Sequence, residues 1–160
     1  VVKAYTTRVG NGPLPTEAES PFGERLRELG GEFGAVTGRP RRCGWFDATV
    51  VRYAARVNGL TGLAVTKLDV LDSFAEIPVG IAYRLDGESC EEMPAEAGAL
   101  GRVKPIYEQL RGWQQSTGSV RRLSDLPSAA RAYLDRLEQL SAVPIRYVSV
   151  GTRRDQIIEV

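Results

Sequence analysis

The pattern of apolar and polar positions predicts three well-defined elements. The run Gly62-Leu63-Ala64-Val65-Thr66 is short and nearly all apolar, which is typical of a strand buried on both faces of a parallel sheet. From residue 126 a proline stands in the first turn of a helix whose apolar positions recur at helical spacing, at Ala130, Leu134, Leu137 and Leu140. Residues 145–150 then alternate as a half-buried strand that ends at Gly151.

Weaker patterns fill the rest of the chain. Residues 1–7 are rich in strand formers and predict one short strand, and residues 22–29 predict a helix that ends at Gly30-Gly31. Asp47 is placed to cap a second helix whose core face would carry Val50, Ala54 and Val57, with Arg52 opposite. Residues 77–83 with a turn at 84–87 predict a hairpin, and residues 103–108 predict a surface segment with Tyr107 and Trp113 packed in the core. We therefore expect an α/β fold: a mostly parallel sheet with flanking helices and an edge hairpin.

The stretch 31–47 cannot be a regular buried element, because glycines and arginines crowd into it. Gly34 and Gly38 permit backbone turns that other residues avoid. Arg39, Arg41 and Arg42 offer forked donors that suit carboxylate or phosphate oxygens. One interpretation is a solvated basic turn. The other is a pocket for a small anionic substrate, which would also use the hydroxyl of Thr37 between the glycines.

Two polar segments follow predicted strands. In open α/β sheets, ligands bind beyond the carboxyl ends of parallel strands, and Lys67-Leu68-Asp69 directly follows the buried run. One carboxylate can accept both N–H groups along the edge of a guanine ring, while a lysine stem lies against its face. Ser149-Val150-Gly151 ends the last strand with small residues that let a flat base approach. The alternative is two charged or polar strand ends in solvent.

Composition limits the class of partner. The chain has 160 residues and a formal net charge of +1, which does not suggest a polyanion partner. Cys43 and Cys90 lie far apart without metal-ligand spacing, so free thiols are expected. No apolar run approaches a membrane span, and no signal peptide is evident. With no initial methionine, the sequence predicts a truncated piece of a soluble cytoplasmic protein.

Three motifs in order resemble the adenylosuccinate synthetase family. They are Lys3-Ala4-Tyr5-Thr6-Thr7-Arg8-Val9-Gly10, the stretch 32–47, and Thr66-Lys67-Leu68-Asp69-Val70-Leu71-Asp72. The resemblance covers residues 1–160 but only the C-terminal part of the family's enzyme. Members carry a glycine-rich phosphate loop, a catalytic aspartate and a catalytic histidine in a longer N-terminal portion, and this sequence has no histidine. The resemblance implies the C-terminal portion of a larger P-loop-like α/β enzyme with no catalytic residue in this chain.

The resemblance also implies binding roles for individual residues. Residues 31–47 would contain the loop for L-aspartate, formed by Ala35, Val36, Thr37, Gly38, Arg39, Pro40 and Arg41. Arg39 and Val9 would contact inosinate (IMP), and Arg41 would also lie near the GTP phosphates. Residues 66–72 and the helix and strand of 126–151 would carry the guanine site, formed by Lys67, Leu68, Asp69, Ser149, Val150 and Gly151. Some members have an arginine where this chain has Pro40, with little expected effect.

The activity implied by the resemblance is ligation of L-aspartate to IMP in AMP biosynthesis. GTP would phosphorylate O6 of inosinate, and the aspartate amine would then displace that phosphate to give adenylosuccinate. The resemblance further implies Mg²⁺ with ligands mainly in the N-terminal portion and none in this chain, a homodimer, and a chain that is inactive without that portion.

Two alternatives remain from the residues. One is a guanine-nucleotide-binding module without catalysis, which would not need an aspartate loop. The other is a nucleic-acid contact surface formed by Arg39, Arg41, Arg42, Arg121, Arg122, Arg153 and Arg154. The near-neutral net charge and the lack of interleaved aromatic residues argue against it.

Overall fold

A computed structural model describes residues 1–96 and 98–160 of the chain. Its main sheet has the strand order β1-β5-β9-β10, formed by Val2–Lys3, Leu63–Thr66, Ile145–Ser149 and Ile157–Glu159. β1, β5 and β9 are parallel, and β10 runs antiparallel to β9. The buried run and the alternating segment of the sequence are therefore neighbours in one sheet, as α/β patterning predicts.

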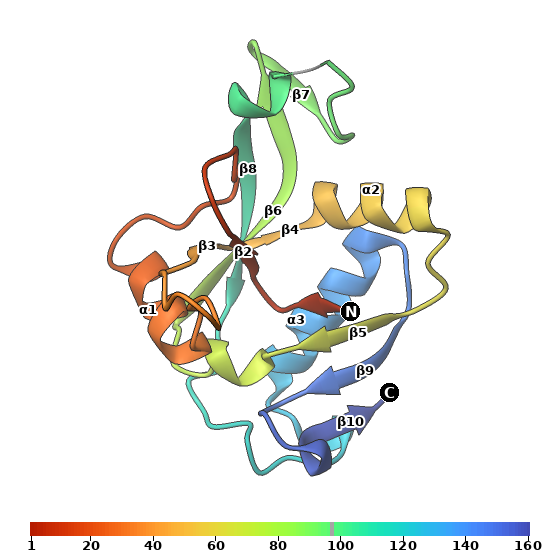
Figure 1. The fold of residues 1–160 in the computed structure, drawn as a ribbon. Helices are drawn as coiled ribbons and strands as arrows, with labels where there is room; N and C mark the ends of the chain where they lie inside the picture. Colours follow the sequence, from red (N-terminus) through yellow and green to blue (C-terminus); the bar gives the residue numbers. More distant parts are fainter. Residues whose placement is uncertain (97) are drawn as a thin grey trace.

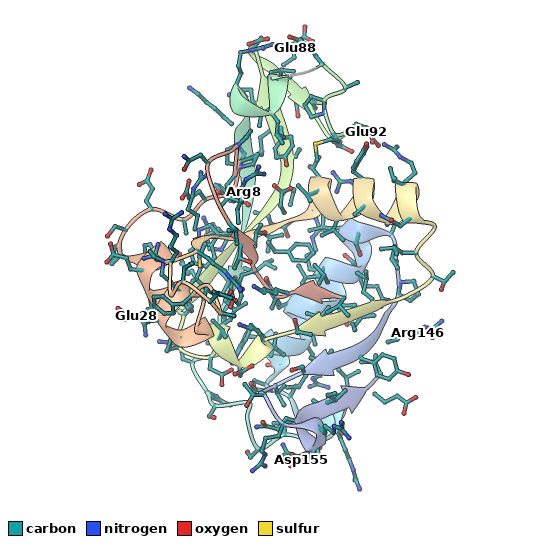
Figure 2. The ribbon with its side chains drawn as sticks, in the orientation of Figure 1. Arg8, Glu28, Glu88, Glu92, Arg146 and Asp155 are labelled. Carbon is teal, nitrogen blue, oxygen red and sulfur yellow. The ribbon has the colours of Figure 1, made fainter. Side chains whose placement is uncertain are left out.

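A second sheet is built on the long strand β6 (Glu76–Leu85). β4 (Phe46–Asp47) pairs with β6 in parallel, whereas β7 (Glu88–Cys90) and β8 (Lys104–Arg111) pair with it antiparallel. A small third sheet pairs β2 (Thr6–Arg8) with β3 (Arg42–Gly44). Figure 1 shows β6 and β8 running out to a tip that carries β7, away from the main sheet. Figure 2 places Glu88 at this tip and Asp155 at the opposite end of the molecule.

The sheets differ from the sequence expectations in four respects. The chain forms mixed sheets rather than one mostly parallel sheet, because β6 pairs with β4, β7 and β8 in a sheet of its own. The hairpin at Asp86-Gly87 forms, with both residues at positive φ, but it lies in the second sheet and not at the edge of the first. Residues 1–7 contribute to two sheets, and the expected surface segment at 103–108 is part of strand β8.

The helices begin and end where the sequence indicates. α1 (Phe22–Gly30) ends at Gly31, which adopts the left-handed conformation, and α2 (Ala48–Asn58) is capped by Asp47, whose side chain accepts a hydrogen bond from the Val50 amide. α3 (Ser128–Ser141) buries Ala130, Tyr133, Leu134 and Leu137. Short 3-10 turns lie at Leu68–Leu71, Ala99–Gly101, Leu123–Asp125 and Arg154–Gln156.

The buried face of α2 differs from the prediction. Val51 and Ala55 are buried, whereas Val57 is 64% exposed. Arg52, expected to face solvent, donates hydrogen bonds to the carbonyls of Ile81 and Leu140. The helix is therefore turned by about one residue, because it packs against both β6 and α3. Trp113 is buried as predicted, and its indole N–H donates to Asp72 at 2.7 Å.

Candidate functional site

The predicted aspartate loop is a compact turn held by its own backbone. The Gly34 amide donates to the Arg39 carbonyl at 2.8 Å, and the Gly38 amide donates to the Gly34 carbonyl at 2.9 Å. Gly38 has a φ of 64°, which other residues rarely adopt. The Thr37 hydroxyl accepts a long hydrogen bond of 3.4 Å from the Arg39 amide. Val36 at the tip is 97% exposed, so the loop extends into solvent. Its internal backbone hydrogen bonds hold its shape.

Arg41 is fixed at the base of this loop. Its backbone amide donates to the Glu32 carbonyl at 2.9 Å, and its guanidinium donates to Glu32 Oε2 at 2.9 Å. Its own carbonyl accepts from Arg27 at 2.8 Å. One guanidinium nitrogen, Arg41 Nε, is buried without a hydrogen-bond partner. The Arg39 side chain, by contrast, makes no hydrogen bond or ion pair to any residue in the described part of the chain.

Lys67 lies at the carboxyl end of β5 and points back toward the loop. It has a φ of 61°, and its ammonium donates to the Gly30 carbonyl at 2.6 Å and to Glu32 Oε1 at 2.8 Å. Lys67 and Arg41 therefore bind opposite oxygens of one carboxylate. This contact joins the predicted aspartate loop to the predicted guanine-reading segment.

Asp69 is half-buried in the turn after Lys67. Its Oδ1 atom is buried without a hydrogen-bond partner. Burial raises the pKa of this carboxyl, and the nearby Asp72 raises it further, although a backbone hydrogen bond and Lys67 act in the other direction. Both carboxylate oxygens of the neighbouring Asp72 already accept hydrogen bonds, from Trp113 Nε1 and from the Thr117 amide and hydroxyl. Of the two carboxylates, Asp69 is the one with an unused acceptor.

Ser149, Val150 and Gly151 end strand β9 beside this segment. The register pairs Val65 with Val148, so the carboxyl ends of β5 and β9 lie side by side. The Ser149 hydroxyl donates to the Gly151 carbonyl at 2.8 Å. A Cβ atom at Gly151 would meet the end of the Gln156 side chain, which would have to move.

Val9 follows strand β2 and is 76% exposed. β2 pairs Arg8 with Arg42, and extending this register by one residue puts Val9 opposite Arg41. Leu68, also among the predicted guanine-site residues, is fully buried, so its side chain is part of the core. The predicted residues thus lie at the carboxyl ends of β2, β5 and β9 and in the loop.

Glu32 is the central residue that the sequence analysis missed. Its side chain is 0% exposed, and it accepts hydrogen bonds from the Tyr5 hydroxyl at 2.6 Å and from the ammonium groups of Lys3 and Lys67 at 2.8 Å each. Burial acts to raise the pKa of this carboxyl, but these donors outweigh it and hold the pKa at about 2. A glutamate among glycines and arginines could have been noticed, but its burial depends on tertiary structure.

Several arginines of the alternative nucleic-acid surface are already paired with acids. Arg42 binds Glu17 through two side-chain hydrogen bonds, and Arg121 and Arg153 both pair with Asp155, at 3.0 and 2.9 Å. Glu17 compensates Arg42, and Asp155 compensates one of the two charges of Arg121 and Arg153. These pairs weaken the case for a basic surface that attracts phosphates.

A separate cavity of about 890 Å³ is lined by other residues. Its wall includes an aromatic group in which the Trp45 and Phe74 rings meet edge to face at 5.6 Å, and Tyr107 also lines it. None of the predicted site residues lines this cavity.

Within residues 1–96 and 98–160, no three or more His, Cys, Asp or Glu side chains are grouped as metal ligands. None of the helices in this same part combines the length and apolarity needed to cross a bilayer. Cys43 and Cys90 are free thiols, as expected.

Comparison with known proteins identifies the family. The sequence profile of adenylosuccinate synthetase matches residues 1–158. The chain belongs to the adenylosuccinate synthetase family. It is 56% identical over 158 residues to the adenylosuccinate synthetase of Carboxydothermus hydrogenoformans and 58% identical over 158 residues to that of Thermosynechococcus vestitus.

The chain is a partial representative of the family. It is covered to 99% by both of these synthetases but spans only 37% and 35% of their length. Its structure matches that of fully ligated adenylosuccinate synthetase from Plasmodium falciparum with a TM-score of 0.95 and 36% identity, over 100% of this chain and 39% of that one. The α/β fold with mixed sheets is therefore the fold of part of an adenylosuccinate synthetase.

Proposed function

We propose that this chain supplies the L-aspartate and guanine subsites of a GTP-dependent ligase that joins L-aspartate to IMP. The products are adenylosuccinate, GDP and phosphate, and the reaction serves AMP biosynthesis in the cytoplasm. The functional protein contains the preceding portion of the enzyme and acts as a homodimer. Residues 1–160 without that portion carry the aspartate loop and the guanine site but are inactive.

The observation that carries this proposal is the position of two unsatisfied polar atoms. Buried side-chain donors and acceptors are nearly always hydrogen-bonded in folded proteins. In the described part of the chain the exceptions are Arg41 Nε, a donor, and Asp69 Oδ1, an acceptor. The first belongs to the proposed aspartate and GTP-phosphate contact and the second to the proposed guanine contact. Ligands with a carboxylate or phosphate and with an N–H edge would satisfy them.

The charge of the site supports anionic substrates. Lys3, Lys67 and Arg41 surround the single carboxylate of Glu32, which leaves positive charge in excess. Each of the three side chains is 25 to 33% exposed and so remains accessible to solvent. Arg39 adds a guanidinium without an internal partner in the described structure. Phosphoryl transfer concentrates negative charge in its transition state, so cations fixed here would lower the barrier.

Each residue has a defined task in the proposed reaction. Asp69 accepts the two N–H groups of the guanine edge, the Lys67 stem lies against the base, and residues 149–151 line it. Thr37, Arg39 and Arg41 orient L-aspartate so that its amine attacks the carbon that carries the phosphorylated O6 of inosinate. Arg39 and Val9 contact inosinate. Mg²⁺ would neutralise charge on the transferring phosphoryl group, and its ligands come from the portion outside this chain.

The test is product formation by a full-length protein that contains these 160 residues. We expect adenylosuccinate from IMP, L-aspartate and GTP, measured by its ultraviolet absorbance and by release of GDP. No product from a folded full-length protein that still binds GTP would instead indicate the alternative, a guanine-nucleotide-binding module.

The guanine contact is tested within the same protein by Asp69→Asn. We expect its preference for GTP over ATP to fall by about tenfold or more, because the amide cannot accept both N–H groups. Asp72→Asn is the matched control, since its carboxylate is saturated by Trp113 and Thr117 and should affect stability but not base preference. Unchanged preference in Asp69→Asn would contradict the assignment.

A further inference from the structure

Glu32 is the most completely bonded side chain of the region and has no assigned role so far. Its carboxylate is fully buried and accepts from one tyrosine, two lysines and one arginine. A buried carboxylate is tolerated when charged donors satisfy it, and removing a charge from such a group disturbs every partner. Lys67 and Arg41 both belong to the proposed ligand contacts.

The two oxygens divide these partners between the two proposed subsites. Oε1 accepts from Lys67, at the end of β5, and also from Lys3 and Tyr5, at and just beyond the end of β1. Oε2 accepts from Arg41 at the base of the loop. The carboxylate of Glu32 thus bridges Lys67 of the guanine segment and Arg41 of the aspartate loop. A shift of Lys67 is transmitted to Arg41 through this rigid group.

The backbone around Glu32 adds to its rigidity. The Glu32 amide donates to the Arg27 carbonyl at 2.8 Å, and its carbonyl accepts from the Arg41 amide at 2.9 Å. The residue is thereby attached to the end of α1 on one side and to the loop on the other. Gly31 before it is left-handed, with a φ of 59°, which turns the chain inward after the helix.

We propose that Glu32 is a positioning residue that couples the aspartate loop to the guanine-reading segment by holding Arg41 and Lys67 on its two oxygens. This inference rests on the proposed function. Three cations surround the single negative charge of Glu32, so the cluster has a net positive charge that can attract an anionic substrate. The bonds to Glu32 fix the orientation of each cation. The proposal predicts that the two substrates respond together when this carboxylate is changed.

The test is Glu32→Gln in the full-length protein. An amide keeps one acceptor oxygen but turns the other position into a donor, which faces either Arg41 or the two lysines. We expect the KM values for L-aspartate and GTP both to rise by about tenfold or more, since the charge of the acceptor is lost on both sides and a hydrogen bond is lost on the side that the amide nitrogen faces. The KM for IMP should change much less, because Arg39 and Val9 are not bonded to Glu32.

Glu108→Gln is the matched control. Glu108 forms an ion pair of 2.7 Å with Arg136 between β8 and α3, and neither residue is part of the proposed site. This variant loses an ion pair between two elements, although a partly exposed one with side chains 34% and 32% exposed, and should keep all three KM values. Equal rises of the three KM values in Glu32→Gln, or the same profile in Glu108→Gln, would show a general structural effect and overturn the proposal.

Lys67→Met tests the coupling without removing the buried carboxylate. Glu32 keeps Lys3, Tyr5 and Arg41 as partners, so the fold should persist if Glu32→Gln does not fold. We expect a several-fold rise in the KM for L-aspartate, although Lys67 is not a proposed aspartate contact. An unchanged KM for L-aspartate would overturn the coupling. Failure of the unaltered protein to make adenylosuccinate would instead overturn the proposed function, and this inference with it.

Discussion

At the scale of single residues, the structure adds the buried carboxylate of Glu32 to a site that was predicted from polar side chains alone. Arg39, Arg41 and Asp69 could be selected from the sequence because their chemistry suits carboxylates, phosphates and a guanine edge. Glu32, Tyr5 and Lys3 could not, because their role depends on burial and on contacts between segments distant in sequence. Leu68 illustrates the same limit, since it was predicted near the ligand and is fully buried.

The ionisation of Glu32 makes a residue-scale prediction about acid stability. Its pKa of about 2 in the folded chain lies below the ordinary value of 4.5, so ionised Glu32 stabilises the fold fully above about pH 4.5. This contribution, about 3 kcal/mol, is lost as the pH falls toward 2. Urea unfolding should therefore show a large difference in the free energy of unfolding between the unaltered chain and Glu32→Gln at pH 7 and a smaller one at pH 3. A difference that is constant with pH would contradict this account.

At the scale of elements, local signals were sufficient for helices and insufficient for sheets. The Asp47 cap, the Gly31 termination of α1 and the spacing in α3 are properties of neighbouring residues, and all appear in the structure. The pairing of β6 with β4, β7 and β8 connects residues far apart in the chain, which no local pattern encodes. The rotation of α2 has the same origin, because its neighbours β6 and α3 decide which face is buried.

The start of α2 provides an element-scale prediction. Asp47 is buried, caps the helix through the Val50 amide at 3.1 Å and accepts from the Tyr83 hydroxyl at 2.7 Å. Asp47→Ala removes the cap and leaves a buried hydroxyl unsatisfied, so we expect a loss of about 2 to 4 kcal/mol in the free energy of unfolding. Tyr83→Phe keeps the cap and should cost less, about 1 kcal/mol. Chemical denaturation measures both, and equal losses would contradict a separate role for the cap.

At the scale of the whole molecule, the mixed sheets explain how residues from distant segments reach one place. The parallel strands β1, β5 and β9 bring the carboxyl ends of three segments to one end of the main sheet, and β5 and β9 point toward the side of the molecule where α1 lies (Figure 1). The sequence predicted the shared edge from the buried run and the final strand. It did not predict that β6 and β8 form a separate projecting sheet.

The most direct test of the account is a crystal structure of the full-length protein with GDP and an L-aspartate analogue. We predict the guanine edge within hydrogen-bond distance of Asp69 and the analogue's carboxylate bound by Thr37 and the loop arginines. Glu32 should still hold Lys67 and Arg41 on opposite oxygens. Guanine bound away from the ends of β5 and β9, or an analogue bound away from the loop, would contradict the central claim.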